Sequence, residues 1–340
     1  MTSHNDFLNI TDSLKEKWNH FVNEHPNGNI FQTPIIASFF QKVKGYEIAL
    51  TLITDENDEV LGVLTGVIQK EGFGILEVLS SRCIIWGGAL VKNNNSEILK
   101  EILSNFESIV RKKAIYIQIR NLYDTSEIKD EMIKFGFKYD EHLNFINTLE
   151  EPEIIVKKFV KTKQYQVKKG LETGAEISNP ESHSDIKEFY SLLYDLYINK
   201  VKKPLPDISY FVQAYDFLIS NNSAFIKLIK VENKIVGGIL CFMDKKFVYD
   251  MYMVGMDKEH KKVSPTVLAI YSAMKQGFEN AIPLFDFMGA GKPDEDYGVR
   301  EFKGMFGGEL VNYGRYEKII KPSLYKIGVL GVKIKGKLKL

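Results

Sequence analysis

Hydrophobic spacing in the first half of the chain predicts a definite order of helices and strands. A helix is expected at residues 12–25, and a turn containing Pro26 and Gly28 ends it. A meander of strands follows, and Ser96 then caps a second helix that leads to a buried strand. The expected strands are residues 46–55, 60–69, 74–80, 83–91, 114–122 and 144–149; the helix after Ser96 has the apolar stripe Ile98, Ile102, Phe106 and Ile109, and a further helix is expected at 126–136.

The second half repeats this order, although its letters do not repeat those of the first half. Two helices are expected first, followed by three strands joined by tight turns. Ser264 and Pro265 open the next helix, with Ser264 as its cap and Pro265 in its first turn. The expected helices are residues 188–200 and 208–221, the strands are 224–232, 234–244, 246–256, 282–288 and 309–320, and the stripe of the helix after Ser264 is Val267, Tyr271, Met274 and Phe278.

The repeated order predicts an α+β fold made of two tandem domains. In each domain, a meander of strands and a crossing helix give a mostly antiparallel, mixed sheet that is layered by helices. Pro152 and the neighbouring acids interrupt the pattern, so the first domain is placed at residues 1–150 and the second at 151–316. Residues 317–340 form a basic tail. A length of 340 residues suits two domains of middle size.

Composition and charge remove several classes of function. A net charge of +1 argues against a general nucleic-acid binder, which needs a broad basic face. No segment is apolar enough to cross a bilayer, and the polar start has no signal pattern, so the cytosol is the default location. Cys83 and Cys241 are expected to be reduced core residues. The six histidines have no metal-ligand spacing, and no metal or redox cofactor is expected.

Three stretches of the sequence carry a family resemblance. They are WNHFVNEHPNGNIFQTP from residue 18, FVKTKQYQVKKGLETGAEI from residue 159, and the most specific block, LFDFMGAG with YGVREFKGMFGG, within residues 284–308. Together they resemble the Fem family, the aminoacyl-tRNA-dependent peptidyltransferases that build peptidoglycan bridges, and related GNAT-like N-acyltransferases. In the middle stretch, Lys161, Lys163 and Gln164 stand where the family usually has arginines.

The resemblance implies two GNAT-like domains and the return of the C-terminal segment to the first one. It also implies transfer of an activated acyl group to an amine, with aminoacyl-tRNA or an acyl-CoA thioester as the donor co-substrate. The acceptor would be a small-molecule or lipid-linked amine, such as a cell-envelope or glycan precursor. Charged tRNA is therefore one candidate partner, and the oligomeric state is left open.

The last block contains the groups that acyl transfer requires. Attack of an amine on an ester or thioester forms an oxyanion that needs a donor or cation, and releases a proton that needs an acceptor. The resemblance matches Lys303 to the lysine at the family's acyl-transfer centre, and Asp286 is the candidate proton acceptor. Gly289 and Gly291 would let the backbone come close to a ligand, and Phe302 would line the slot beside Lys303.

Further candidates for substrate binding are lysines that could hold phosphate groups. Lys262 and Ser264 lead into a helix whose free amides favour an anion, where GNAT enzymes hold the coenzyme A pyrophosphate. The Gly-rich turn of those enzymes is absent, which argues against tight coenzyme A binding. The resemblance implies a site for the diphosphate of the acceptor, for which the candidates are Lys42, Lys44, Lys202, Lys203 and Tyr210.

Two alternatives and one surface stay open from sequence alone. The alternatives are an acyl-CoA-dependent N-acyltransferase for an amino sugar or small amine, and a non-catalytic GNAT scaffold that binds a ligand. From Lys318 onward the chain has lysines and no acids, and residues 332–340 alternate at strand period. That pattern predicts either an edge strand protected by lysines or weak contact with the inner face of the membrane.

Overall fold

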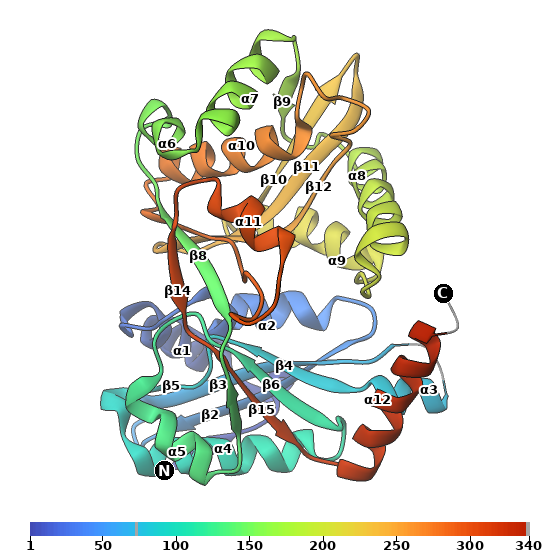
Figure 1. The fold of residues 1–340 in the computed structure, drawn as a ribbon. Helices are drawn as coiled ribbons and strands as arrows, with labels where there is room; N and C mark the ends of the chain where they lie inside the picture. Colours follow the sequence, from blue (N-terminus) through green and yellow to red (C-terminus); the bar gives the residue numbers. More distant parts are fainter. Residues whose placement is uncertain (72–73, 338–340) are drawn as a thin grey trace. The chain divides into compact units, whose positions relative to one another are not determined.

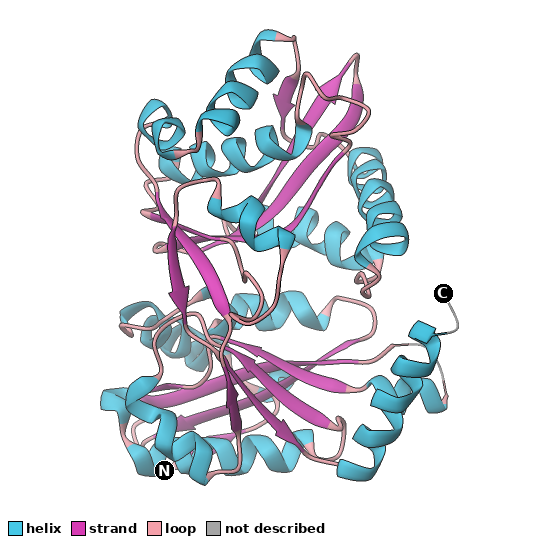
Figure 2. Cartoon of the chain, in the orientation of Figure 1, coloured by secondary structure: helices cyan, strands magenta, loops and turns pink. Residues whose placement is uncertain are grey.

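The computed structural model describes residues 1–71 and 74–337, and the side chains of the C-terminal helix only as far as Val329. Two compact units divide the chain: Met1–Glu141 with Tyr313–Leu340, and His142–Asn312 (Figure 1). Each unit contains one sheet with helices packed on it, which confirms the predicted α+β class (Figure 2).

The sheet of the first unit is antiparallel except at one pair. Its strand order is β1-β2-β3-β4-β6-β15-β7, β5 also pairs with β3, and of the strands that the structure describes only β4 and β6 run parallel. Within residues 1–71 and 74–337, β7 pairs only with β15, so β15 joins β7 to the rest of the sheet. The strands are β1 (Thr2–His4), β2 (Tyr46–Thr54), β3 (Val60–Gln69), β4 (Arg82–Trp86), β5 (Leu90–Val91), β6 (Tyr116–Arg120), β7 (Lys138–Asp140) and β15 (Arg315–Ile319).

Helix α4 connects the parallel strands β4 and β6. It also supplies the main apolar helix face that packs in the core of this unit. The whole predicted stripe of α4 packs in the core, with Ile109 partly buried. The helical segments of the unit are η1 (Phe7–Asn9), α1 (Asp12–Glu24), η2 (Ile30–Gln32), α2 (Pro34–Gln41), α3 (Ile75–Ser80), η3 (Lys92–Asn94), α4 (Ser96–Val110), η4 (Ser126–Ile128), α5 (Lys129–Lys134) and α12 (Pro322–Lys337).

Gln32 fastens two strands of this sheet to one another. Its side chain is fully buried, and its amide nitrogen donates to the carbonyls of Thr65 (3.1 Å) and Trp86 (2.8 Å). Its amide oxygen accepts the backbone N–H of Thr65 at 2.7 Å. The indole of Trp18 in turn donates to the backbone carbonyl of Gln32 at 2.7 Å. The opening stretch that resembles the Fem family is therefore a structural clamp across β3 and β4.

The second unit has the same plan. Its sheet has the order β14-β8-β13-β12-β11-β10-β9. Among the described strands of this sheet only β12 and β13 run parallel, and helix α10 is the crossing between them. The strands are β8 (Leu143–Thr148), β9 (Glu176–Ser178), β10 (Ala224–Val231), β11 (Lys234–Met243), β12 (Phe247–Gly255), β13 (Leu284–Asp286) and β14 (Glu309–Asn312).

Helix α10 is buried on most of its surface in the core of the second unit, so the predicted single stripe is too narrow. Val267 and Met274 are buried, whereas Phe278 is exposed. Gly277 lets the helix approach Val248 of β12, since a Cβ there would lie 2.8 Å from that side chain. The helical segments are α6 (Pro152–Lys158), α7 (Lys161–Glu172), α8 (His183–Leu196), the π-helical turn η5 (Tyr197–Val201), α9 (Ile208–Gln213), the π-helical turn η6 (Ala214–Ile219), α10 (Pro265–Glu279) and α11 (Gly298–Gly304).

Two local predictions in the first unit are wrong. Of the expected strand 74–80, residues Ile75–Ser80 form helix α3. The ladder of β3 and β4 ends at the pair Gln69 and Arg82, so no described strand pairs with this segment. The cap of α4 is Asn95 rather than Ser96. The carboxamide oxygen of Asn95 accepts the N–H groups of Glu97 and Ile98, a role that Asn fills as well as Ser.

The end of the chain also differs from its prediction. The expected strand 309–320 is split at Gly314, whose φ of +67° and closeness to the Tyr139 ring exclude a side chain. Beyond it, Pro322 begins helix α12, so residues up to Lys337 are helical and the predicted edge strand at 332–340 is wrong over that range; its last three residues lie outside the described part.

The boundary between the units lies earlier than predicted. The sequence analysis places it after residue 150, whereas the compact units divide between Glu141 and His142. Strand β8 explains the difference, because it pairs with β13 and β14 of the second sheet.

Candidate active site in the second unit

Lys303 is a buried lysine held by two backbone carbonyls. It lies on helix α11, and only 8% of the residue is exposed, so its ammonium does not reach along the surface to solvent. Its Nζ donates to the carbonyl oxygen of Phe287 at 2.6 Å and to that of Gly289 at 2.9 Å. The predicted charge in an apolar slot is therefore present, and its position is fixed.

These carbonyls become available because β13 is short. The parallel ladder between β12 and β13 ends at the pair Tyr249 and Asp286, while β12 continues to Gly255. Just beyond, Met288 (φ +57°) and Gly289 (φ +120°) turn the chain away from an extended path. The lysine ammonium thus takes the place of a neighbouring strand as hydrogen-bond partner at this end of the sheet.

Asp286 is fully buried beside this turn, and one of its oxygens has no partner. Its Oδ1 accepts the side-chain amide of Asn144 at 2.7 Å and also accepts the N–H of Met288. The carboxamide oxygen of Asn144 in turn accepts the N–H of Gly289 at 2.7 Å. Within residues 1–71 and 74–337, Oδ2 of Asp286 makes no hydrogen bond. Because a buried polar atom rarely stays unpaired, this oxygen is suited to meet a ligand.

A second buried carboxylate, Asp250 of β12, belongs to the same charge cluster. Burial raises the pKa of Asp286 to about 6, against the opposing effect of its hydrogen bonds from Asn144 and Met288 and of the Lys303 charge. Burial likewise raises the pKa of Asp250 to about 6, with Lys303 lowering it and Asp286 raising it. Burial lowers the pKa of Lys303, and the two carboxylates oppose that effect. The cluster therefore holds one cation and two carboxyls that titrate near neutrality.

This arrangement contains the groups needed for amide formation. A fixed ammonium can stabilise an oxyanion, and a carboxylate with a pKa near 6 can accept a proton at neutral pH. Sequence patterns alone do not single out Asp250 or Asn144. The signal for both was a polar residue inside an otherwise buried strand.

Gly291 and Phe302 shape the surroundings of Lys303. Gly291 has φ +79°, and a Cβ there would lie 2.7 Å from the Tyr297 ring, so a larger residue is excluded. The Phe302 ring packs edge-to-face on Phe306, and the ammonium of Lys163 lies 4.6 Å from the centroid of the Phe302 ring. Phe302 is therefore a partner of Lys163, and its contact with substrate stays a prediction.

The start of helix α10 is occupied by an acid of the chain itself. Ser264 is buried in the left-handed conformation, and its hydroxyl donates to the carbonyl of Lys261 instead of capping the helix, so the predicted side-chain cap is wrong. The carboxylate of Asp257 accepts the N–H of Thr266 at 3.0 Å. An anion at this helix start would therefore meet a negative charge, although Lys262 is exposed next to it.

The remaining predicted residues lie in different places. Lys42 and Lys44 are exposed in the first unit just after α2, and Lys202 and Lys203 are exposed in the second unit after η5. Tyr210 is buried among the rings of Phe211, Phe242 and Tyr252. Convergence of the two lysine pairs on a diphosphate stays a prediction.

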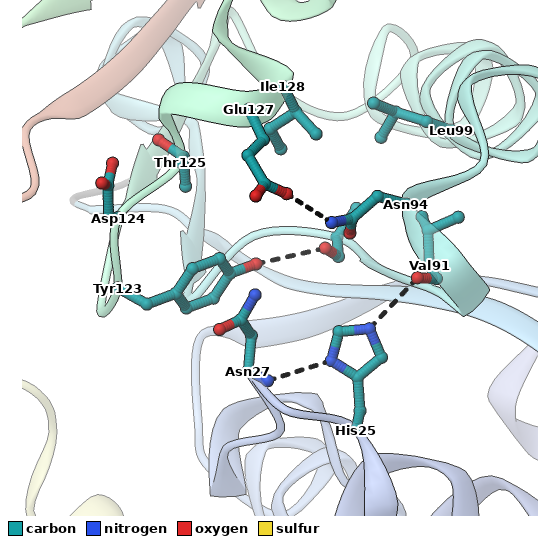
Figure 3. Close-up of a pocket in the computed structure, with 11 residues that line it drawn as sticks. His25, Asn27, Val91, Asn94, Leu99, Tyr123, Asp124, Thr125, Glu127 and Ile128 are labelled. Carbon is teal, nitrogen blue, oxygen red and sulfur yellow. Dashed lines mark hydrogen bonds between the residues drawn. The ribbon is translucent and has the colours of Figure 1, made fainter.

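A polar cavity in the first unit contains none of the predicted residues (Figure 3). Its volume of about 30 Å³ is on the scale of ordered water and far below that of a substrate pocket. The His25 ring lies across it, accepting the N–H of Asn27 at Nδ1 and donating from Nε2 to the carbonyl of Val91. Asn94 donates to Glu127 at 2.8 Å. These polar groups largely satisfy one another.

Comparison with known proteins finds a family match over this part of the chain. Residues 199–330, which include Asp250, Asp286 and Lys303, match the model of the FemAB family. Over these residues the chain is similar to the FemAB family. This confirms the resemblance seen in the sequence.

Individual relatives support the same conclusion. Lipid II:glycine glycyltransferases of two Staphylococcus epidermidis strains are 23% identical to this chain over 250 residues, covering 67% of this chain and 56% of theirs. The chain thus spans just over half the length of these relatives. The crystal structure of FemX superposes with a TM-score of 0.71 at 18% identity, over 96% of this chain and 99% of that one.

The tandem arrangement has its own counterpart. A tandem GNAT protein from the clavulanic acid biosynthesis pathway superposes with a TM-score of 0.58 at 9% identity, over 94% of this chain and 98% of that one. At these identities the structures show the fold alone, and they confirm two GNAT-like domains in tandem.

Proposed function

We propose that this protein is an acyltransferase that forms an amide on a primary amine of a cell-envelope precursor. The observation that carries the proposal is the buried Lys303 ammonium, fixed by two carbonyls next to the carboxyls of Asp286 and Asp250. The match of this region to the FemAB family and the similarity to lipid II:glycine glycyltransferases support a peptidoglycan precursor as the acceptor class.

The proposed reaction uses each member of the cluster once. The neutral amine attacks the carbonyl carbon of the activated acyl group, the C–N bond forms, and the Lys303 ammonium stabilises the oxyanion. The proton of the attacking nitrogen passes to the carboxylate pair, for which the unpartnered Oδ2 of Asp286 is the available atom. The C–O or C–S bond to the leaving group then breaks, and the leaving group recovers a proton.

The proposed donor is an aminoacyl-tRNA. A screen that offers charged tRNAs and acyl-CoA thioesters separately, each with a lysine-containing peptidoglycan precursor, tests both the activity and the donor by mass spectrometry of the product. Amide product from a charged tRNA supports the proposal. Product from acyl-CoA alone favours an acyl-CoA-dependent N-acyltransferase, and ligand retention without product from either donor favours a binding scaffold.

Free coenzyme A is expected to bind weakly or not at all. The amide at the start of α10 that a pyrophosphate would use already holds the Asp257 carboxylate. Isothermal titration calorimetry measures this directly, and Asp257→Asn, which removes the negative charge, is expected to bind coenzyme A more tightly than the natural chain. Micromolar affinity in the natural chain that disappears in Lys262→Glu contradicts this expectation.

The pH dependence of transfer is expected to report the carboxylate pair. Since the pair must be ionised to accept the proton, kcat/KM should rise with pH through an apparent pKa of about 6. Asp250→Asn is expected to lower kcat/KM at neutral pH roughly tenfold. This is less than the roughly hundredfold or greater loss of acid–base assistance as a whole, because Asp286 remains. Asp216→Asn, an exposed acid of the same unit that pairs with His183, is the control.

The stability of Asp250→Asn separates a chemical effect from a folding effect. An Asp whose pKa is raised on folding contributes stability that is present at low pH and is lost as pH rises from the ordinary value through about 6. At pH 7 the Asn variant no longer buries a charge, so its melting temperature should be no lower than that of the natural chain. A profile with no limb near pH 6, or full activity in Asp250→Asn, removes Asp250 from the reaction.

A further inference from the structure

Helix α3 exposes large apolar side chains to solvent. Ile75 is 66% exposed, Leu76 57% and Val78 43%, within a helix of six residues. The one acid of this helix, Glu77, pairs with Lys70 at 3.6 Å. Scattered apolar residues on a surface are ordinary, but three in one short helix need a reason.

Helix α12 extends the same apolar surface. The two helices lie side by side (Figure 1) and touch, since a Cβ on Gly328 would come within 2.8 Å of the Leu79 carbonyl. The residues on either side of that glycine, Ile327 and Val329, are 54% and 38% exposed. Five large apolar side chains on two touching helices are thus exposed, and we call them the α3–α12 patch.

The charge of the surrounding chain is one-sided. From Lys318 to the end the sequence contains seven lysines and no Asp or Glu, in a protein whose net charge is only +1. Lys318 is used inside the first unit, where it pairs with Glu107 at 2.6 Å. Lys321 is half-buried and Lys326 is exposed next to Ile327, and the other four lysines follow in the sequence. Exposed aliphatic side chains next to lysines, with no Asp or Glu among them, match a partner surface that has an apolar layer covered by anionic groups.

We propose that the α3–α12 patch docks on the surface of an anionic lipid bilayer. Aliphatic side chains can enter the boundary between headgroups and acyl chains, while lysines interact with the anionic headgroups. The patch and its lysines contain no arginine, and its exposed apolar residues are aliphatic, so base stacking and bidentate phosphate recognition do not suit it. No helix within residues 1–71 and 74–337 has the length and apolarity to span a bilayer, so the contact is peripheral.

Vesicle flotation tests this docking without any enzymatic assay. The full chain is mixed with vesicles of phosphatidylcholine containing about a third phosphatidylglycerol, which supplies the anionic surface, and with pure phosphatidylcholine vesicles. Binding is expected to the anionic vesicles at low salt and to weaken at high salt. Leu76→Ser with Ile327→Ser should weaken binding roughly tenfold, because two exposed aliphatic side chains no longer bury apolar surface in the membrane.

Matched variants assign the effect to the patch. Ile133→Ser removes an apolar side chain that is 48% exposed on α5 of the same unit, and it should float like the natural chain. Replacing Lys326 and Lys333 by Gln should weaken binding roughly fivefold for each lysine that lies near the surface. Circular dichroism melts confirm that each variant is folded.

Three results overturn the proposal. The natural chain stays in the soluble fraction at low salt, or the Leu76→Ser, Ile327→Ser variant floats as well as the Ile133→Ser control. Light scattering shows a dimer that this variant makes monomeric, in which case a second copy of the chain covers the patch instead of a membrane. The outcome of vesicle flotation does not depend on the proposed acyltransferase activity, which the donor screen tests separately.

Discussion

Replacing Lys303 by Met is expected to lower the turnover of amide formation by roughly a hundredfold or more, the scale of losing one group that stabilises the oxyanion. Met keeps the volume of the side chain but removes the ammonium. The expected loss lies in kcat, because the charge acts on the transition state more than on the bound ground state. Single-turnover measurements with the donor identified in the screen provide the value.

The structure also predicts a cost to stability in Lys303→Met. The carbonyls of Phe287 and Gly289 lose their donor in a buried place, at about 1–3 kcal/mol for each group left unpaired. Turnover must therefore be measured at a temperature where circular dichroism shows the variant folded. Lys230→Met is the control, since Lys230 is another poorly exposed lysine of the second unit, 3.9 Å from Asp185. Near-normal turnover in the folded Lys303 variant would exclude Lys303 from the mechanism.

Gln32→Leu is expected to lower the free energy of unfolding by about 3 kcal/mol or more. The substitution leaves the N–H and carbonyl of Thr65 and the carbonyl of Trp86 without their partner inside the core. Urea unfolding measures the loss as a shift of the midpoint. Gln118→Leu, which removes a half-buried amide that accepts from Arg120 at 3.0 Å, should cost less than about 1 kcal/mol. Equal midpoints for the two variants would show that the clamp contributes little.

The order of elements could be predicted because apolar residues recur at the helical period in the core helices and at the strand period in the core strands. The α4 stripe is buried as expected, and the strands 224–232, 234–244 and 246–256 correspond to β10, β11 and β12. The α3 segment could not be predicted, because an apolar run of that length fits a strand or a helix equally and only the ladder of β3 and β4 decides. The same limit applies to α12, where the alternation of lysines and apolar residues fits a strand although the described segment is a helix.

The residues of the candidate site could be predicted only where the sequence contains a recognisable motif. Lys303 and Asp286 were found from the block that resembles the Fem family, and the structure places both in one buried charge cluster. Asp250 and Asn144 come from other strands and join them through sheet pairing, which no spacing in the sequence encodes. The negative charge at the start of α10 comes from Asp257, which folds back to accept the N–H of Thr266. This contact is likewise a property of the turn rather than of a sequence motif.

The position of β15 has a consequence for the synthesis of the chain on the ribosome. The second unit is one contiguous segment whose ends are paired, with Leu143 opposite Asn312, so it can fold once that segment has emerged. The first unit has to wait, because the gap between β6 and β7 is filled only by Arg315–Ile319. Until then the edge of β6 is open, and a nascent or truncated chain that stops before these residues presents an unpaired strand to its neighbours.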